Sequence, residues 1–259
     1  MIIIKNKHAI RKMYTAAQLL VSVFDELPAL LVAGVSTLDI DSWVTSMLKE
    51  KGLIAVCKGY SGYQHASCIS VNDEVVHGVP SKDKILCDGD LVKVDVCAAW
   101  SGYCADMARS FFIGASAQVP VESARLVSVA QDALDWGIRQ AVAGNRVSDI
   151  SAAIQHEVEK NGFSVVRDFA GHGIGKKMHE EPEVLNYGRP GVGPLLRPGM
   201  ALAIEPMIVM GDYPVYVAGD GWTVRTVDKS LAAHVEDTVV ILEDGPCVLT
   251  RNSQRELSL

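Results

Sequence analysis

Apolar residues recur every three or four positions near the start of the chain, at residues 9–24, and this spacing predicts an amphipathic helix. A second helix is expected from Thr37, with Ser36 or Thr37 as its cap and Lys51-Gly52 as its end. Both helices precede a clear change in the pattern.

From residue 53 to residue 112 the chain consists of short β-rich pieces separated by Gly, Asp and Pro. Strands are predicted at residues 66–76, 91–99 and 103–112, which are among the β-rich pieces of this region. The close spacing of the last two predicts an antiparallel, hairpin-rich region.

Helical spacing returns at residues 120–143 and 148–160, and strand-like, glycine-rich sequence follows at 163–249. Helices followed by strands, twice over, predict an α+β fold whose two similar halves pack around one antiparallel sheet. We place the halves at about residues 1–115 and 116–259.

The chain has 259 residues and no Pro/Ser-rich linker, so we expect one domain over residues 1–259. A hydrophobic content of 49% predicts a sizeable core. The net charge of −7 and the lack of a Lys/Arg-rich run argue against a broad nucleic-acid-binding surface.

The apolar runs are shorter than the roughly 20 residues that a membrane helix needs, so we expect no membrane association. The N-terminal Met-Ile-Ile-Ile-Lys is also too short for a signal peptide. Six cysteines without a Cys-x-x-Cys pair are typical of reduced thiols. A cytoplasmic location is expected.

Two acids of the predicted hairpin are of chemical interest. In the sequence LVKVDVC, Asp95 alternates with valines, and Asp106 lies on the returning strand. For a loop of two or four residues, the two side chains share one sheet face, roughly 5–8 Å apart at Cβ. A shared divalent cation would relieve their repulsion. The alternative is that both are solvated on an exposed face.

The second half supplies further candidate ligands. His172 lies between glycines in GHGIG, and His179 follows in HEEP. Glu205 ends an apolar run in ALAIEP, and Glu236 precedes the hydrophobic strand 238–242. Each of these has a plain structural alternative, as a packed histidine or a satisfied core glutamate. His77, in HGVP, completes the set.

Five of these residues would make a chemically complete metal site: Asp95, Asp106, His172, Glu205 and Glu236. Four carboxylates and one imidazole balance the charge of two divalent ions. Hydrolases with two metals need such bridging carboxylates, which hold the ions about 3.5–4 Å apart. The composition of the set therefore predicts a dinuclear hydrolase centre.

The sequence resembles the type I methionine aminopeptidases, which have the pita-bread (creatinase/aminopeptidase) fold. The resemblance extends over residues 9–244. It rests on the order and spacing of these motifs: HGVP, VDV, CADMARSF, GHGIG, HEEP, IEPM, DGWTV and VEDTVVILEDG.

The resemblance implies a role for each ligand. Asp95 would chelate one ion with both oxygens, Asp106 and Glu236 would bridge the pair, and His172 and Glu205 would complete the shell of the second ion. The two ions could be Mn, Fe(II), Co or Zn, because the O/N ligand set accepts each of them.

It also implies the reaction, which is removal of the initiator methionine from a new polypeptide whose second residue is small. A metal-bridging hydroxide would attack the methionyl carbonyl while Glu205 handles the proton. His77 would face the scissile amide nitrogen, and His179 the carbonyl oxygen as it becomes an oxyanion. Neither histidine would be a metal ligand.

By the same resemblance, an apolar pocket holds the methionine side chain. It would be lined by Tyr63, Cys68, Met178, Met207 and Trp222, with Phe169 nearby. Without the resemblance, these residues would be interpreted as ordinary core. A monovalent-cation site is also implied, at the backbone around Asn72 and Glu74.

Three positions depart from the family pattern and bear on pocket shape, metal preference and efficiency. Ser61 stands where bacterial members often have histidine, Met178 where an aromatic residue is common, and Asp237 where histidine usually follows the bridging glutamate. None of them removes a metal ligand.

Two rival functions remain to be separated. Prolidases and proline-specific aminopeptidases share the fold and the metal set but generally carry an extra N-terminal domain. A non-catalytic relative that binds RNA or partner proteins would have lost its metal. For the favoured function, we expect Met-Xaa polypeptide substrates, a monomer, and the ribosome surface as a candidate partner.

Overall fold

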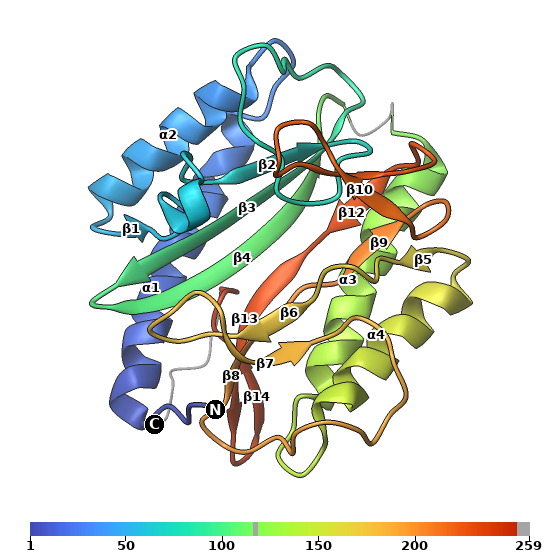
Figure 1. The fold of residues 1–259 in the computed structure, drawn as a ribbon. Helices are drawn as coiled ribbons and strands as arrows, with labels where there is room; N and C mark the ends of the chain where they lie inside the picture. Colours follow the sequence, from blue (N-terminus) through green and yellow to red (C-terminus); the bar gives the residue numbers. More distant parts are fainter. Residues whose placement is uncertain (116–118, 253–259) are drawn as a thin grey trace.

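The computed structural model describes residues 1–115 and 119–252. Its centre is a curved nine-stranded sheet, flanked by two pairs of helices (Figure 1). The main path through this sheet is β1 (Ile54–Ala55), β3 (Leu91–Trp100), β4 (Tyr103–Phe112), β13 (Glu236–Leu242), β8 (Ala201–Ile204), β6 (Gly171–Gly173) and β7 (Glu180–Val184), with β2 (Cys68–Val71) also paired to β3 and β14 (Gly245–Val248) to β13. Because each of these pairs is antiparallel, the α+β fold with an antiparallel sheet is confirmed.

The first half begins with two capped helices. The Asn6 side chain accepts a hydrogen bond from the backbone of Ala9, and Ser36 forms a capping box with Asp39. The elements of this half are α1 (Lys7–Glu26), η1 (Leu27–Ala29), α2 (Thr37–Glu50), β1 (Ile54–Ala55), η2 (Tyr60–Gly62), β2 (Cys68–Val71), β3 (Leu91–Trp100) and β4 (Tyr103–Phe112).

The second half repeats the order of helices and then strands. Its elements are α3 (Val121–Gln140), α4 (Val147–Lys160), β5 (Ser164–Val165), β6 (Gly171–Gly173), β7 (Glu180–Val184), β8 (Ala201–Ile204), β9 (Met207–Val209), β10 (Val215–Val217), β11 (Val224–Thr226), β12 (Ala232–His234), β13 (Glu236–Leu242) and β14 (Gly245–Val248). The strands β4 and β13 join the halves at the centre of the sheet.

The β3–β4 hairpin closes through a two-residue turn. Ser101 and Gly102 both have positive φ, 51° and 77°, as a type I′ turn requires. Asp106 is therefore opposite Cys97, and Asp95 is its diagonal neighbour on the same face. The expected placement of the two acids is confirmed.

Alternation along the strands separates two faces of the sheet. Val94 and Val96 belong to the core that includes α1 and α2, whereas Val239 and Ile241 belong to the core that includes α3 and α4. Asp95 has the opposite parity to these valines and so faces away from the helices. The chemical side chains and the helices occupy opposite faces.

One predicted strand is shorter than expected. Residues 66–76 form only the four-residue strand β2, because Asn72 adopts a left-handed conformation (φ 54°) and turns the chain out of the sheet. The predicted boundary between the halves lies beside residues 116–118, which are outside the described residues. That the chain forms a single domain stays a prediction. Within the described part of the chain, no helix has the length and apolar character needed to cross a bilayer.

Candidate metal centre and substrate pocket

The predicted site residues gather around a single cavity of about 420 Å³ on the face of the sheet away from the helices. Its lining includes the five predicted metal ligands, the two histidines predicted to face the substrate, the five predicted pocket residues and Phe169, which was expected nearby: Asp95, Asp106, His172, Glu205, Glu236, His77, His179, Tyr63, Cys68, Met178, Met207, Trp222 and Phe169. Elements distant in sequence therefore build one site.

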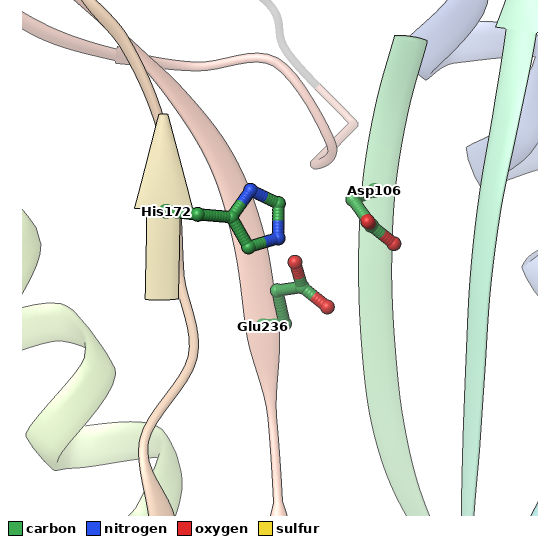
Figure 2. Close-up of side chains that lie close together, drawn as sticks. All are labelled: Asp106, His172 and Glu236. Carbon is green, nitrogen blue, oxygen red and sulfur yellow. The ribbon is translucent and has the colours of Figure 1, made fainter. Parts of the chain in front are cut away.

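Strand pairing brings Asp106 and Glu236 together. Glu236 pairs with Ala108, and Thr238 exchanges hydrogen bonds with the Asp106 backbone through its hydroxyl. Figure 2 shows the carboxylates of Asp106 and Glu236 converging with the His172 ring from β4, β13 and β6. One ligand atom from each of these three residues lies within 4.8 Å of the other two.

His172 is oriented to offer one nitrogen to a cation. Its Nδ1 is 2.9 Å from the carbonyl oxygen of Gly173, so Nδ1–H donates there and Nε2 keeps its lone pair. The flanking glycines allow this close packing: a Cβ on Gly171 would lie 2.4 Å from the Ala203 carbonyl, and one on Gly173 2.2 Å from the Glu181 carbonyl.

Glu205 follows β8 and lies beside two imidazoles. Its Oε1 is 3.5 Å from His172 Nε2, and its Oε2 is 3.7 Å from His234 Nε2. The His234 side chain is buried, and neither of its ring nitrogens has a hydrogen-bond partner among the described residues. Glu205, the remaining predicted ligand on this side, therefore lies in the cavity wall next to His172.

The electrostatics of the site favour a bound cation. Burial raises the pKa of Asp106 to about 6, and burial together with neighbouring carboxylates raises the pKa values of Asp95, Glu205 and Glu236 well above their usual range. Burial lowers the pKa of His172 to about 4, which keeps it neutral and able to ligate near pH 7.

The donor set also fits divalent metal ions chemically. Asp106 Oδ1 and Glu236 Oε1 are buried with no hydrogen-bond partner in the part of the chain that the structure describes. Such atoms are costly unless a cation or proton satisfies them. Clustered carboxylates with one neutral imidazole are ligands that Mn, Fe, Co and Zn accept.

His77 is held in a strained conformation at the cavity. Its φ is 57°, a left-handed value that is uncommon for residues other than glycine. The next residue must be small, because a Cβ on Gly78 would lie 2.3 Å from the Ile69 carbonyl oxygen. The His77 ring packs edge-on against Phe169, and burial lowers its pKa to about 4.

His179 lies beside His172, one of the predicted metal ligands. Its ring centroid is 4.4 Å from that of His172, and its Nδ1 is 3.0 Å from the hydroxyl of Tyr60. Burial lowers its pKa, so the ring is neutral near pH 7. Tyr60 thus orients His179, and its hydroxyl can set which nitrogen carries the proton.

The apolar part of the cavity combines aromatic and sulfur-containing side chains. Tyr63 and Trp222 meet edge to face at 5.0 Å between centroids, and the Tyr63 hydroxyl donates to the Ser67 carbonyl oxygen at 2.9 Å. The sulfurs of Cys57 and Met178 are 3.9 Å apart. Soft, polarizable groups of this kind pack well against a thioether.

The three departures from the family pattern differ in consequence. Met178 lines the cavity, but Ser61 and Asp237 are not among its lining residues. Asp237 is fully buried, and its carboxylate forms ion pairs with Arg109 at 2.7 Å and Arg251 at 2.6 Å. This acid therefore ties β13 to β4 and to the C-terminal segment, with no contact to the substrate cavity.

The implied monovalent-cation site does not fit. Nζ of Lys93 donates to the Asn72 carbonyl oxygen at 2.8 Å, so the lysine ammonium stands where a monovalent cation would bind this oxygen. The Glu74 carboxylate is likewise engaged, by Lys84 at 2.7 Å and Arg225 at 2.6 Å.

Sequence reasoning missed two functional candidates, Tyr60 and His234. Tyr60 lies three residues before Tyr63, which was already predicted to line the pocket, and this proximity was an available signal. His234 precedes Glu236 by two residues, but its burial depends on packing between distant strands, which no local pattern reveals.

Residues 11–243 match metallopeptidase family M24. The methionine aminopeptidase of Clostridium acetobutylicum is 47% identical over 250 residues, with coverage of 96% of this chain and 99% of that one.

Solved structures agree. The crystal structure of methionine aminopeptidase from Thermotoga maritima has a TM-score of 0.94 and 42% identity, covering 97% of this chain and 100% of that one. Prolidase from Pyrococcus furiosus shares the fold, at 22% identity and a TM-score of 0.78. The match covers 97% of this chain but only 66% of the prolidase chain. The pita-bread fold is thus confirmed, and the chain belongs to metallopeptidase family M24.

Proposed function

We propose that this protein is a methionine aminopeptidase, a metal-dependent hydrolase that removes the N-terminal methionine when the second residue is small. The observation that carries the proposal is the cavity in which four carboxylates, two of them buried, and the Nε2 of His172 meet an apolar, sulfur-rich pocket. The full-length similarity to proteins named methionine aminopeptidase supports it.

The metal centre would hold two divalent ions, chosen from Mn, Fe(II), Co and Zn by availability. Asp95 would be a ligand of one ion, Asp106 and Glu236 would be shared by both ions, and His172 and Glu205 would be ligands of the second ion. The bound metal supplies a water nucleophile near neutral pH and polarises the substrate carbonyl.

The chain's own groups would then position the substrate and move protons. Glu205 would accept the proton of the attacking water, since its pKa is raised and it lines the cavity. His179, oriented by Tyr60 through Nδ1, would present Nε2–H to the developing oxyanion. His77 would hydrogen-bond the scissile amide nitrogen.

Selectivity would come from the pocket and from its rim. Tyr63, Cys68, Met178, Met207 and Trp222 would enclose the methionine side chain, where an ionised side chain would be desolvated without a partner. The second residue would pass near His77 and His179, so a bulky side chain there would displace the scissile carbonyl.

The physiological setting is part of the same proposal. The protein would act in the cytoplasm, as a monomer, on new polypeptides. The ribosome surface is a candidate partner.

The test is metal reconstitution. Chelator-treated protein is assayed on Met-Ala-Ser with each of the four ions added separately. We expect no hydrolysis without metal and release of methionine with at least one ion. Failure of every ion to restore hydrolysis in protein that binds metal would overturn the proposal.

A further inference from the structure

Lys93 is a buried lysine that the proposed reaction does not use. It lies on β3 between Ser70 of β2 and Ser110 of β4, and its exposed fraction is 1%. By strand alternation its side chain is on the same face as Asp95. A lysine is seldom fully buried in a sheet, because its ammonium must leave water.

The Lys93 ammonium is bound by the carbonyl oxygen of Asn72, which lies in a turn held by several hydrogen bonds. The Asn72 carbonyl oxygen accepts from Lys93 Nζ at 2.8 Å and from the Ala232 backbone at 3.1 Å. The Asn72 side chain is fixed on both ends, since it donates to Asp90 at 2.8 Å and accepts from the Leu91 backbone at 3.0 Å. The turn therefore joins first-half strands to β12 of the second half.

The acids around the turn have other partners. Glu74 is paired with Lys84 and Arg225, and Asp73 is paired with Arg225 at 3.1 Å. The bond that Lys93 makes is thus to a backbone carbonyl and not to a carboxylate. Carbonyl oxygens bind K⁺ and Na⁺ in the same way, and an ammonium group carries the same charge in a similar volume.

We infer that Lys93 is a built-in substitute for a bound monovalent metal ion. Its ammonium holds the Asn72 turn against β12, so the protein needs no K⁺ or Na⁺ at this position. The inference departs from what the family resemblance implied, and it is independent of the proposed peptidase activity.

The measurement is the melting temperature of the full-length protein at constant divalent metal, in 0.2 M KCl or 0.2 M choline chloride. Burial lowers the pKa of Lys93 to about 7, against the opposing effect of Glu74, Asp73 and Asp90. The buffer is therefore held at pH 6.0, where the ammonium form prevails. The wild-type protein should melt at the same temperature in both salts.

Two substitutions separate charge from volume. Lys93→Ala opens space beside the Asn72 carbonyl, and Lys93→Met removes the charge but fills the space. Both should lose roughly 5–10 °C in choline chloride. KCl should restore about 3 °C or more to the alanine variant, and nothing to the methionine variant. The exposed Lys49→Ala serves as the control and should not respond to either salt.

Crystals soaked in Tl⁺ locate the ion directly. An anomalous peak at the Asn72 carbonyl is expected in Lys93→Ala and not in the wild type. A wild-type peak there, or a wild-type melting temperature raised by K⁺, would overturn the inference. An alanine variant that melts identically in both salts would overturn it as well. Should that variant fail to fold, the melting temperatures and the Tl⁺ soak of the wild-type protein still test the inference.

Discussion

The substitution Asp106→Asn should have opposite effects on the metal-free and the metal-loaded protein. Asp106 is buried beside other carboxylates, and its Oδ1 has no hydrogen-bond partner among the described residues. Burial raises its pKa from 3.8 to about 6. A carboxyl whose pKa is raised on folding stabilises the folded state only while protonated, so this stability is lost as pH rises from about 4 through about 6.

The magnitude follows from the shift. A pKa difference of this size corresponds to roughly 3 kcal/mol of destabilisation once Asp106 is ionised. The pKa values of His77 and His172 are lowered, so at pH 8 both rings are neutral in the folded and the unfolded protein. They therefore add no pH dependence to the free energy of unfolding. An uncharged amide removes the penalty, so metal-free Asp106→Asn should melt up to roughly 6–12 °C above the wild type at pH 8.

The assay is thermal unfolding at pH 8 in chelator and in excess Mn²⁺, with metal content and Met-Ala-Ser turnover measured in parallel. Metal should stabilise the wild type strongly and the variant little, and turnover of the variant should be abolished. Exposed Asp132→Asn is the matched control and should behave as wild type. A metal-free variant no more stable than wild type, or one with full metal stabilisation, would refute the reasoning.

Other substitutions test the remaining roles. His77→Ala should keep its metal but lose about 10²-fold in turnover, the size typical of a positioned hydrogen-bond donor; metal loss would instead make His77 a ligand. Tyr60→Phe should lower kcat by roughly tenfold with little change in KM, because His179 loses the partner of its Nδ1; an unchanged kcat would contradict this role. Asp237→Ala should cost about 3 kcal/mol in urea unfolding, because it removes the fully buried carboxylate that pairs with Arg109 and Arg251, and an unshifted midpoint would show that these two pairs contribute nothing.

The local parts of the site could be predicted from sequence because they depend on short-range rules. The two-fold period of β3 and β4, together with a two-residue turn, is sufficient to place Asp95 and Asp106 on one face. The meeting of His172, Glu205 and Glu236 depends on pairing between strands far apart in the chain. Charge balance made that grouping reasonable, and the family resemblance supplied the individual roles.

Sequence reasoning is weakest for residues whose environment is set by tertiary contacts. Alternation alone would assign Lys93 to a solvated face, and its burial comes from the left-handed turn at Asn72 and its contact with β12. Asp237 was expected to bear on the site because it stands where the family usually has histidine, but strand alternation turns its side chain toward Arg109 and Arg251 on the other face.

The central claim, that the cavity selects an N-terminal methionine before a small residue, is tested most directly by the specificity constants of the metal-loaded enzyme for a peptide set. Met-Ala and Met-Gly peptides should be cleaved, whereas Met-Lys and Met-Phe peptides should be cleaved at least about 10²-fold less efficiently. A leucine in first position should be only partly rejected, since such a change in an apolar pocket is worth about 1–3 kcal/mol. Equal cleavage of Met-Lys, or a preference for Xaa-Pro peptides whatever the first residue, would contradict the account.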